Sequence, residues 1–216
     1  TYHAPENVIE PISTYAEVIC NTLLDELKPG DLPRLYIESG RAIVDEAGFL
    51  ISTIYTSKRL PDGRKAYFAD GGINLLFTAF WYSYRVSFDR ELNGQDEPSV
   101  IFGPLCMNID VVKDQLMLPD ISDGTRVILS PVGAYNVTQW LQFIDYRPNI
   151  VMVSTESQVE IIRNAEDLSD ITRREVLPDR LKLKGHMIPL YTHAGERNSA
   201  MEDTVPLESI RKQLFS

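Results

Sequence analysis

The sequence is poor in cysteine, in positive charge and in long hydrophobic runs, and each shortage excludes a class of protein. Its two cysteines, Cys20 and Cys106, lie far apart in unrelated contexts, so a reduced compartment, the cytoplasm, is expected rather than a disulfide scaffold. A formal charge of −10 leaves no basic stripe for phosphates, and no nucleic-acid partner is expected. The longest apolar run, Leu75 to Trp81, is far too short to span a membrane, so no membrane partner is expected.

The N-terminus lacks two further features. No basic segment followed by an apolar one opens the chain, so no signal peptide is indicated. The chain starts with Thr1-Tyr2-His3 and has no initiator methionine, which is typical of the interior of a longer protein. Its 216 residues, 44% of them hydrophobic, are enough for one or two domains with a sizeable core.

Residues 1–48 have the pattern of an α/β barrel. Apolar residues at helical spacing predict a helix from Glu10 that ends at Lys28-Pro29-Gly30, and Arg34 to Glu38 is predicted to be a short buried strand. A helix, a brief loop and a strand ending in a polar turn form the half-unit of such a barrel. We therefore predict that these residues are the last helix and strand of an α/β barrel, which one half-unit cannot close.

From Phe49 the pattern changes to β. Phe49 to Thr56 is rich in β-branched and aromatic residues, and Leu60-Pro61-Asp62-Gly63-Arg64 is a strong hairpin signal. Further strands are predicted at Lys65–Ala69, Leu76–Phe80, Tyr84–Phe88, Ser99–Phe102, Thr125–Ser130, Ile150–Ser154 and Gln158–Arg163, and helical turns at Asn136–Phe143 and Glu166–Glu175. These short strands predict an antiparallel β-barrel or sandwich over residues 49–177, so the chain should be mixed but mostly β. Residues 178–216 lack periodicity and are predicted to be a tail or linker.

The stretch from Phe102 to Asp110 places a cysteine between a Gly-Pro turn and an acid. Gly103-Pro104 should end the preceding strand and hold the next residues in a rigid loop. Cys106 would then lie at a loop tip, where reactive groups are usually presented. The alternative is a small buried thiol beside a solvated aspartate, since free cysteine is among the most buried residue types.

Three other stretches carry polar or flexible residues beside predicted strands. Glu38-Ser39-Gly40-Arg41 puts an acid and a guanidinium at a strand's C-terminal end, where an arginine suits a phosphate, although an ordinary ion pair is the alternative. Asp70-Gly71-Gly72 permits close backbone approach or is a plain turn. Gly133-Ala134-Tyr135-Asn136 puts a phenol where free N–H groups of a helix start bind anions, or where a tyrosine simply packs.

In their order and spacing these four stretches resemble the C-terminal half of the fold-type III pyridoxal-phosphate decarboxylases. That family includes diaminopimelate, ornithine and arginine decarboxylases, and the resemblance runs from about Tyr15 to Leu177. It implies an N-terminal (β/α) barrel followed by a β-barrel, in agreement with the change of pattern at Phe49. It also implies an amino-acid decarboxylase, a carbon–carbon lyase, that uses pyridoxal 5′-phosphate (PLP) and acts as a homodimer. No metal site is expected.

The resemblance implies a role for each residue of the cofactor motifs. Glu38 matches the acid that pairs with the pyridine nitrogen and keeps it protonated. Gly40 belongs to the same cofactor-binding turn, and Arg41 matches a residue near the cofactor phosphate. Tyr135 matches the tyrosine that contacts this phosphate from the β domain. Cys106 matches the cysteine that reprotonates the carbanion in the neighbouring protomer, which a thiol can do because its pKa lies near working pH.

The substrate region departs from the family pattern. Asp110 matches a motif acid, but Met107 stands where ornithine and diaminopimelate decarboxylases carry an acid for the distal end of the substrate. Thr78 and Tyr82 fall where other tail-binding residues are expected, and neither is charged. A methionine cannot pair with a distal ammonium, so we expect a substrate with a neutral, acidic or bulky side chain instead.

The family's Schiff-base lysine, its ring histidine and its glycine-rich phosphate loop have no counterpart in this sequence. Lys28, Lys58 and Lys65 lie in helix-end or hairpin contexts. We therefore expect a C-terminal piece of a decarboxylase whose partner is an N-terminal barrel segment, on the same polypeptide or on a separate chain. A non-catalytic scaffold or decoy stays open as an alternative. A fold-type III racemase is a further one, although racemases keep an arginine where Glu38 offers a carboxylate.

Overall fold

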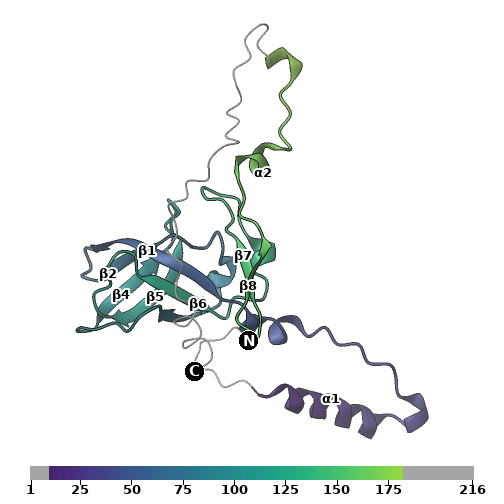
Figure 1. Ribbon diagram of the computed structural model, residues 1–216. Coiled ribbons are helices and arrows are strands. Elements are labelled where there is room, and N and C mark those ends of the chain that lie inside the picture. The colour runs from purple at the N-terminus through teal and green to yellow at the C-terminus, as the bar shows by residue number, and fades with distance from the viewer. Residues whose placement is uncertain (1–9, 182–216) are drawn as a thin grey trace. The chain divides into compact units, whose positions relative to one another are not determined.

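The computed structural model describes residues 10–181, which belong to two compact units divided between Leu141 and Gln142 (Figure 1). The sheet unit, residues 10–141, contains helix α1 (Ile12–Glu26) and strands β1 (Leu50–Arg59), β2 (Lys65–Ala69), β3 (Arg85–Phe88), β4 (Glu97–Phe102), β5 (Val111–Leu118) and β6 (Arg126–Ser130). The hairpin unit, residues 142–181, contains β7 (Ile150–Val153), β8 (Val159–Arg163) and α2 (Leu168–Thr172). Short 3-10 helices are η1 (Pro29–Asp31), η2 (Gly40–Ala42), η3 (Asp45–Ala47), η4 (Phe77–Phe80), η5 (Val137–Gln139) and η6 (Asp179–Leu181).

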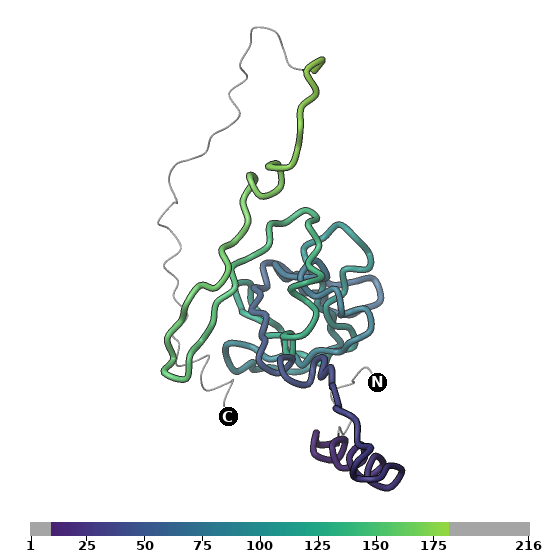
Figure 2. The backbone as a smooth tube through the Cα atoms, turned by 90° about the vertical axis from the view of Figure 1, so that its right-hand side faces the viewer, coloured from purple at the N-terminus to yellow at the C-terminus, as the bar shows by residue number. Residues whose placement is uncertain are grey.

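The six strands of the sheet unit form one curled sheet in the order β3-β6-β1-β2-β4-β5. All neighbours are antiparallel except β2 and β4, which run parallel. The first half of β1 pairs with β6 and its second half with β2, with a register shift between Ile54 and Thr56. This change of partner along one long strand curls the sheet, and Figure 2 shows the backbone of the unit winding around its interior.

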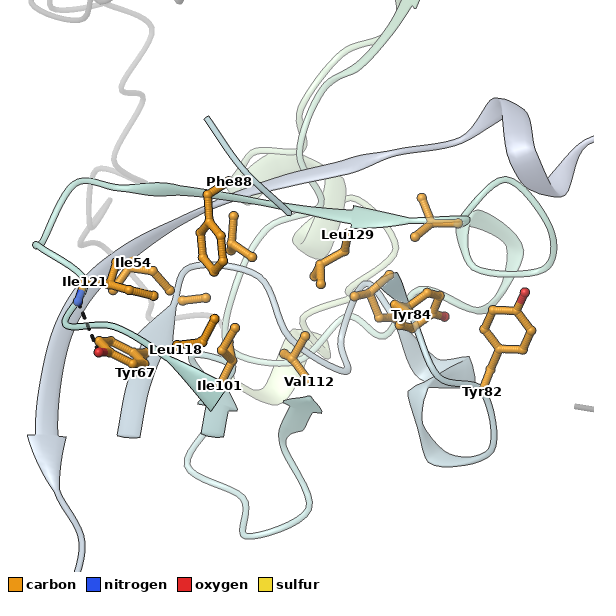
Figure 3. Close-up of a cluster of buried hydrophobic side chains, with 14 residues drawn as sticks. Ile54, Tyr67, Tyr82, Tyr84, Phe88, Ile101, Val112, Leu118, Ile121 and Leu129 are labelled. Atoms are coloured by element: carbon orange, nitrogen blue, oxygen red, sulfur yellow. Dashed lines mark hydrogen bonds between the residues drawn. The ribbon is translucent and has the colours of Figure 1, made fainter. Parts of the chain in front are cut away.

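The core of the sheet unit lies on the inner face of the curled sheet. Phe88 and Leu129 point inward from β3 and β6 and face Ile101, Val112 and Leu118 on β4 and β5 (Figure 3). Burial of these apolar side chains stabilises the curl, since each removes its surface from water. The Tyr67 hydroxyl at the edge of this cluster is paired, since it accepts the backbone N–H of Ile121 at 3.1 Å.

Much of the β pattern was predictable from the sequence. The helix after Glu10, the hairpin between β1 and β2, and the hairpin of β7 and β8 are all present. The prediction of a strand at Leu76–Phe80 is wrong. There the backbone forms η4, because local N–H groups bond the carbonyls of Gly72 and Thr78 instead of a neighbouring strand. Strand β5 and the parallel pair were not predicted.

The predicted α/β barrel remnant is not confirmed. Helix α1 has no buried residue, and Arg34 to Glu38 has no regular secondary structure. No strand within residues 10–181 pairs with that segment, and a strand needs a ladder partner to form. The proposed boundaries at residues 48/49 and 177/178 stay predictions, and residues 182–216 of the expected tail lie outside the described residues. None of the helices described is both long enough and apolar enough to cross a membrane.

Candidate cofactor and catalytic site

Two segments far apart in the sequence pack against each other, the arginine loop (residues 40–48) and the tyrosine loop (residues 132–136). The backbone N–H of Gly133 donates to the carbonyl of Asp45 at 3.0 Å. A β-carbon on Gly133 would lie 1.8 Å from the carbonyl oxygen of Val44, so only glycine permits this approach. The glycine of the Gly-Ala-Tyr motif therefore seats the tyrosine loop on the arginine loop.

The guanidinium of Arg41 lies close to two aromatic rings, that of Tyr135 on the tyrosine loop and that of Tyr82. Its Cζ atom is 4.2 Å from the centroid of the Tyr82 ring and 5.4 Å from that of Tyr135, within the range of cation–π attraction. Gly40, with φ of +56°, turns the chain so that a β-carbon there would lie 3.2 Å from the Tyr135 hydroxyl. The structure thus brings together Gly40, Arg41 and Tyr135, three of the four predicted cofactor-binding residues.

The buried carboxylate of Asp45 pairs with this guanidinium. Nη1 of Arg41 lies 2.7 Å from Oδ2 of Asp45, which also accepts a hydrogen bond from the Tyr82 hydroxyl at 3.1 Å. Burial lowers the pKa of Arg41, but the hydrogen bond and charge of Asp45 outweigh it, so the net shift is upward. Burial, followed by the charge of Asp45, raises the pKa of Tyr82. Arg41 is therefore a cation and Tyr82 a neutral donor at neutral pH.

The tyrosine loop is held from within by a buried polar cluster. Oδ1 of Asn136 accepts hydrogen bonds from the hydroxyls of Thr78, at 3.0 Å, and Tyr84, at 3.1 Å. The Thr78 and Tyr84 hydroxyl oxygens also lie within hydrogen-bonding distance of each other, so one of the two protons is shared between this contact and Asn136. Tyr135 itself is about half exposed and has φ of +68°, a conformation that a bulky residue adopts only under constraint. The cluster thus supplies a constraint that presents the Tyr135 ring beside Arg41.

The cysteine loop, residues 103–110, is organised by Asp110, which is only 1% exposed. Its Oδ1 accepts the N–H of Ile73 at 2.8 Å and its Oδ2 accepts the N–H of Leu105 at 2.7 Å. A β-carbon on Gly72 would lie 2.2 Å from Oδ1, so the Asp-Gly stretch serves close approach and is not a plain turn. The carboxylate therefore holds the loop, and its predicted contact with substrate stays a prediction.

Cys106 has an exposed, free thiol on this loop. The alternative of a buried thiol beside a solvated aspartate is wrong, because the thiol is exposed and the carboxylate of Asp110 is buried. Met107, the next residue, is also exposed. Their predicted roles in proton donation and substrate binding stay predictions.

Glu38, the fourth predicted cofactor residue, lies two residues before Gly40 and is exposed. Within residues 10–181 its carboxylate has no hydrogen-bond or ion-pair partner among the contacts of the chain. The same residues contain no group of three or more histidine, cysteine, aspartate or glutamate side chains placed to hold a metal ion. Asp45 and Tyr84 were missed from the sequence, because no motif marks them, and Asn136 stood in the Gly-Ala-Tyr-Asn stretch without a role assigned to it.

The class that the fold defines is a mostly β domain built on one curled sheet, with Arg41 and Tyr135 brought together on its loops. Residues 41–133 match the family described as pyridoxal-dependent decarboxylase, C-terminal sheet domain. The resemblance to the C-terminal half of the fold-type III pyridoxal-phosphate-dependent decarboxylases, which the motifs predicted, is therefore confirmed.

Relatives and solved structures agree with this assignment. A diaminopimelate decarboxylase of Methanothermobacter thermautotrophicus is 30% identical over 185 residues, which are 83% of this chain and 42% of that protein. The diaminopimelate decarboxylase of Methanocaldococcus jannaschii is 27% identical over 77% of this chain and 38% of that protein. A crystal structure of the M. jannaschii enzyme superposes with a TM-score of 0.74 at 26% identity, over 83% of this chain and 41% of that one. The chain thus spans about two fifths of the length of these relatives.

Proposed function

We propose that this chain is the C-terminal portion of a PLP-dependent amino-acid decarboxylase and that its arginine and tyrosine loops hold the cofactor phosphate. The observation that carries the proposal is that Tyr135 lies beside Gly40 and Arg41, although more than ninety residues separate it from them in the sequence. These are three of the four residues that the resemblance assigns to the cofactor, the fourth being Glu38.

The chemistry of these residues suits PLP. A guanidinium offers several N–H donors to phosphate oxygens, and the raised pKa of Arg41 keeps it charged. The half-exposed Tyr135 adds a hydroxyl donor, and Gly40 leaves open space that a side chain would fill. The exposed carboxylate of Glu38 is suited to a protonated pyridine nitrogen. The donor set therefore fits the cofactor.

In this proposal two side chains of the chain control protons: Glu38 keeps one on the cofactor, and Cys106 donates one to the substrate. PLP, when bound, provides a pyridine ring that takes up the electron pair left by departing CO₂. Glu38 holds the proton on the ring nitrogen. The thiol of Cys106, exposed on a loop anchored by Asp110, gives a proton to the substrate carbon that has lost CO₂. In this family that thiol reaches the partner protomer's cofactor, so a homodimer is part of the proposal.

An N-terminal barrel segment completes the proposed enzyme, because the lysine that attaches PLP belongs to it. Apolar side chains on the first part of the chain support such a partner. On α1, Tyr15 and Val18 are 55% and 61% exposed. In the segment after it, which has no regular secondary structure, Tyr36 and Ile37 are 79% and 65% exposed. Exposed apolar surface on this scale is typical of a face that packs against another part of a protein.

The proposed substrate lacks a distal ammonium group, although the relatives are diaminopimelate decarboxylases. Thr78 is buried and bonds Asn136, and Tyr82 is buried and bonds Asp45, so neither carries charge to a substrate. Met107 is apolar and exposed at the loop where an acid would serve. A panel of L-amino acids tests this, and fastest CO₂ release from L-ornithine or meso-diaminopimelate would refute it.

The cofactor assignment is tested by adding PLP to this chain together with its barrel segment. We expect a yellow protein whose visible absorbance is bleached by borohydride, and CO₂ release from an amino acid. An Arg41→Ala variant should weaken PLP binding by about tenfold or more, since a charged hydrogen-bonding partner is lost. A colourless complex would support the decoy alternative. Interconversion of L- and D-amino acids without CO₂ would support the racemase.

A further inference from the structure

We propose that Asp45 is a positioning residue of this site, which fixes the guanidinium of Arg41 beside the rings of Tyr82 and Tyr135 and fastens the tyrosine loop to the arginine loop. The inference deepens the proposed function, since it assigns the residue that holds the phosphate-binding arginine in place. Asp45 itself is not expected to touch the cofactor.

The contacts of Asp45 come from three separate segments of the sheet unit. Oδ2 accepts from Nη1 of Arg41 at 2.7 Å and from the Tyr82 hydroxyl at 3.1 Å. Oδ1 accepts from the N–H of Ala134 at 3.2 Å, and the carbonyl oxygen of Asp45 accepts from the N–H of Gly133 at 3.0 Å. The Asp45 side chain, with 9% of its surface exposed, thus bonds Arg41, the hydroxyl of Tyr82 and the loop that carries Tyr135.

These contacts matter because an arginine side chain has many rotamers, and each bond to phosphate requires one of them. The ion pair engages Nη1, and a guanidinium has further donors for an anion. The rings of Tyr82 and Tyr135, whose centroids lie 4.2 and 5.4 Å from Cζ, further restrict the positions that the guanidinium can take. Asp45 therefore removes, before the ligand arrives, the freedom that Arg41 would otherwise lose on binding.

Substitution of Asp45 separates positioning from a simple effect of its negative charge. A carboxylate near a phosphate repels it, so its removal by Asp45→Asn should tighten PLP binding if Asp45 acted only through its charge. If Asp45 positions Arg41, the same variant should weaken binding, because the amide cannot accept all the bonds that the two carboxylate oxygens accept. The sign of the change separates the two accounts.

A second variant covers the case in which Asp45→Asn fails to fold. Asp45→Glu keeps the charge but places it one methylene further out, so it should displace the guanidinium and also weaken binding. An account based on charge predicts no change for this variant.

Two carboxylates serve as matched controls. Asp89 has a side chain 11% exposed, pairs with Arg90 at 2.9 Å and accepts the N–H of Arg126 at 3.3 Å, so Asp89→Asn imitates the loss of a partly buried ion pair away from Arg41. Glu46 is the neighbour of Asp45 but pairs at the surface with Arg85, so Glu46→Gln removes the same charge without touching the site. Both should leave PLP affinity within about twofold of wild type.

The experiment has one measurement on this chain and one on the PLP-loaded enzyme that contains it. Nitrogen-15 NMR of arginine Nε–Hε groups should show a resolved Arg41 signal, assigned with Arg41→Lys. That signal should move to the position of solvent-exposed arginines in Asp45→Asn and stay in place in Asp89→Asn. The dissociation constant of PLP should rise by about tenfold or more in Asp45→Asn and Asp45→Glu.

An unchanged Arg41 signal in Asp45→Asn, or PLP binding as tight as that of the wild type in either Asp45 variant, would overturn the proposal. If the wild-type enzyme binds no PLP, the proposed function fails. The NMR signal then still decides whether Asp45 positions Arg41, because that measurement needs no cofactor.

Discussion

Replacing Asp110 with alanine should destabilise the sheet unit strongly, because this buried carboxylate holds the cysteine loop. The change removes the acceptors of the Ile73 and Leu105 N–H groups, at 2.8 and 2.7 Å. Hydrogen bonds to a charged group contribute about 1.5–3 kcal/mol each, and a buried donor left unpaired costs about 1–3 kcal/mol. Water entering the space of the lost carboxylate offsets part of this, so we expect a net loss of about 3–5 kcal/mol.

The loss should be measurable as a shift of the unfolding transition. Unfolding entropy of about 2.1 cal/mol/K per residue, over roughly 130 residues, converts about 4 kcal/mol into a fall in Tm of about 10–15 °C. Urea denaturation followed by tryptophan fluorescence gives the same free energy independently. The single-site substitution should leave the m-value unchanged if the native state stays folded.

Asp114→Ala is the matched control, since Asp114 lies on the next strand but has a side chain 48% exposed and pairs with Arg64 at the surface. It should cost less than about 1 kcal/mol. The loss of unfolding free energy in Asp110→Asn should lie between those of Asp110→Ala and Asp114→Ala. The amide oxygen accepts one of the two N–H groups, but the amide NH₂ faces the other. An Asp110→Ala variant within about 1 kcal/mol of the wild type would refute the role given to this carboxylate.

Three further outcomes are expected. Gly133→Ala should cost about 3 kcal/mol or more in urea denaturation, because its β-carbon would lie 1.8 Å from a carbonyl oxygen; a smaller loss would show that the loops separate easily. Tyr84→Phe should cost about 1–2 kcal/mol by the same assay, since Asn136 loses a buried donor, and an unchanged midpoint would contradict this. The hydrogen bond from Arg90 lowers the pKa of Asp89 more than burial raises it. That stabilisation is complete above the unfolded pKa of about 3.9 and is lost as pH falls through the lower folded pKa, so Asp89→Asn should flatten the acid side of a plot of Tm against pH.

Local patterns in the sequence were sufficient where the structure depends on neighbouring residues. The Leu60–Arg64 turn predicted the hairpin of β1 and β2, and the Gly103-Pro104 turn predicted an exposed cysteine loop, because each turn requires particular backbone angles. The strand predicted at Leu76–Phe80 failed because apolar composition does not show that Thr78 bonds Asn136, more than fifty residues away. The parallel pairing of β2 with β4 depends on long-range register in the same way.

The site was predictable only in part for the same reason. The resemblance to the decarboxylase family identified Glu38, Gly40, Arg41 and Tyr135 as one set, and the structure brings the last three together. Asp45 could not be identified, since an acid in a short helical turn normally faces solvent, and only the fold shows that it accepts bonds from three segments. Glu38 lies in a segment without a ladder partner among the described residues, so its expected strand did not form.

The most direct test of the account mixes two variants of the enzyme, Cys106→Ala and Arg41→Ala, at a PLP concentration that loads wild-type sites but leaves Arg41→Ala sites empty, so that each variant alone is inactive. If the thiol of one protomer serves the cofactor held by Arg41 of the other, half of the dimers are mixed after exchange, and each has one intact site. Activity should then return to about a quarter of the wild-type value. If mixing and exchange restore no activity, the thiol and the arginine do not act across a dimer, and the central claim is contradicted.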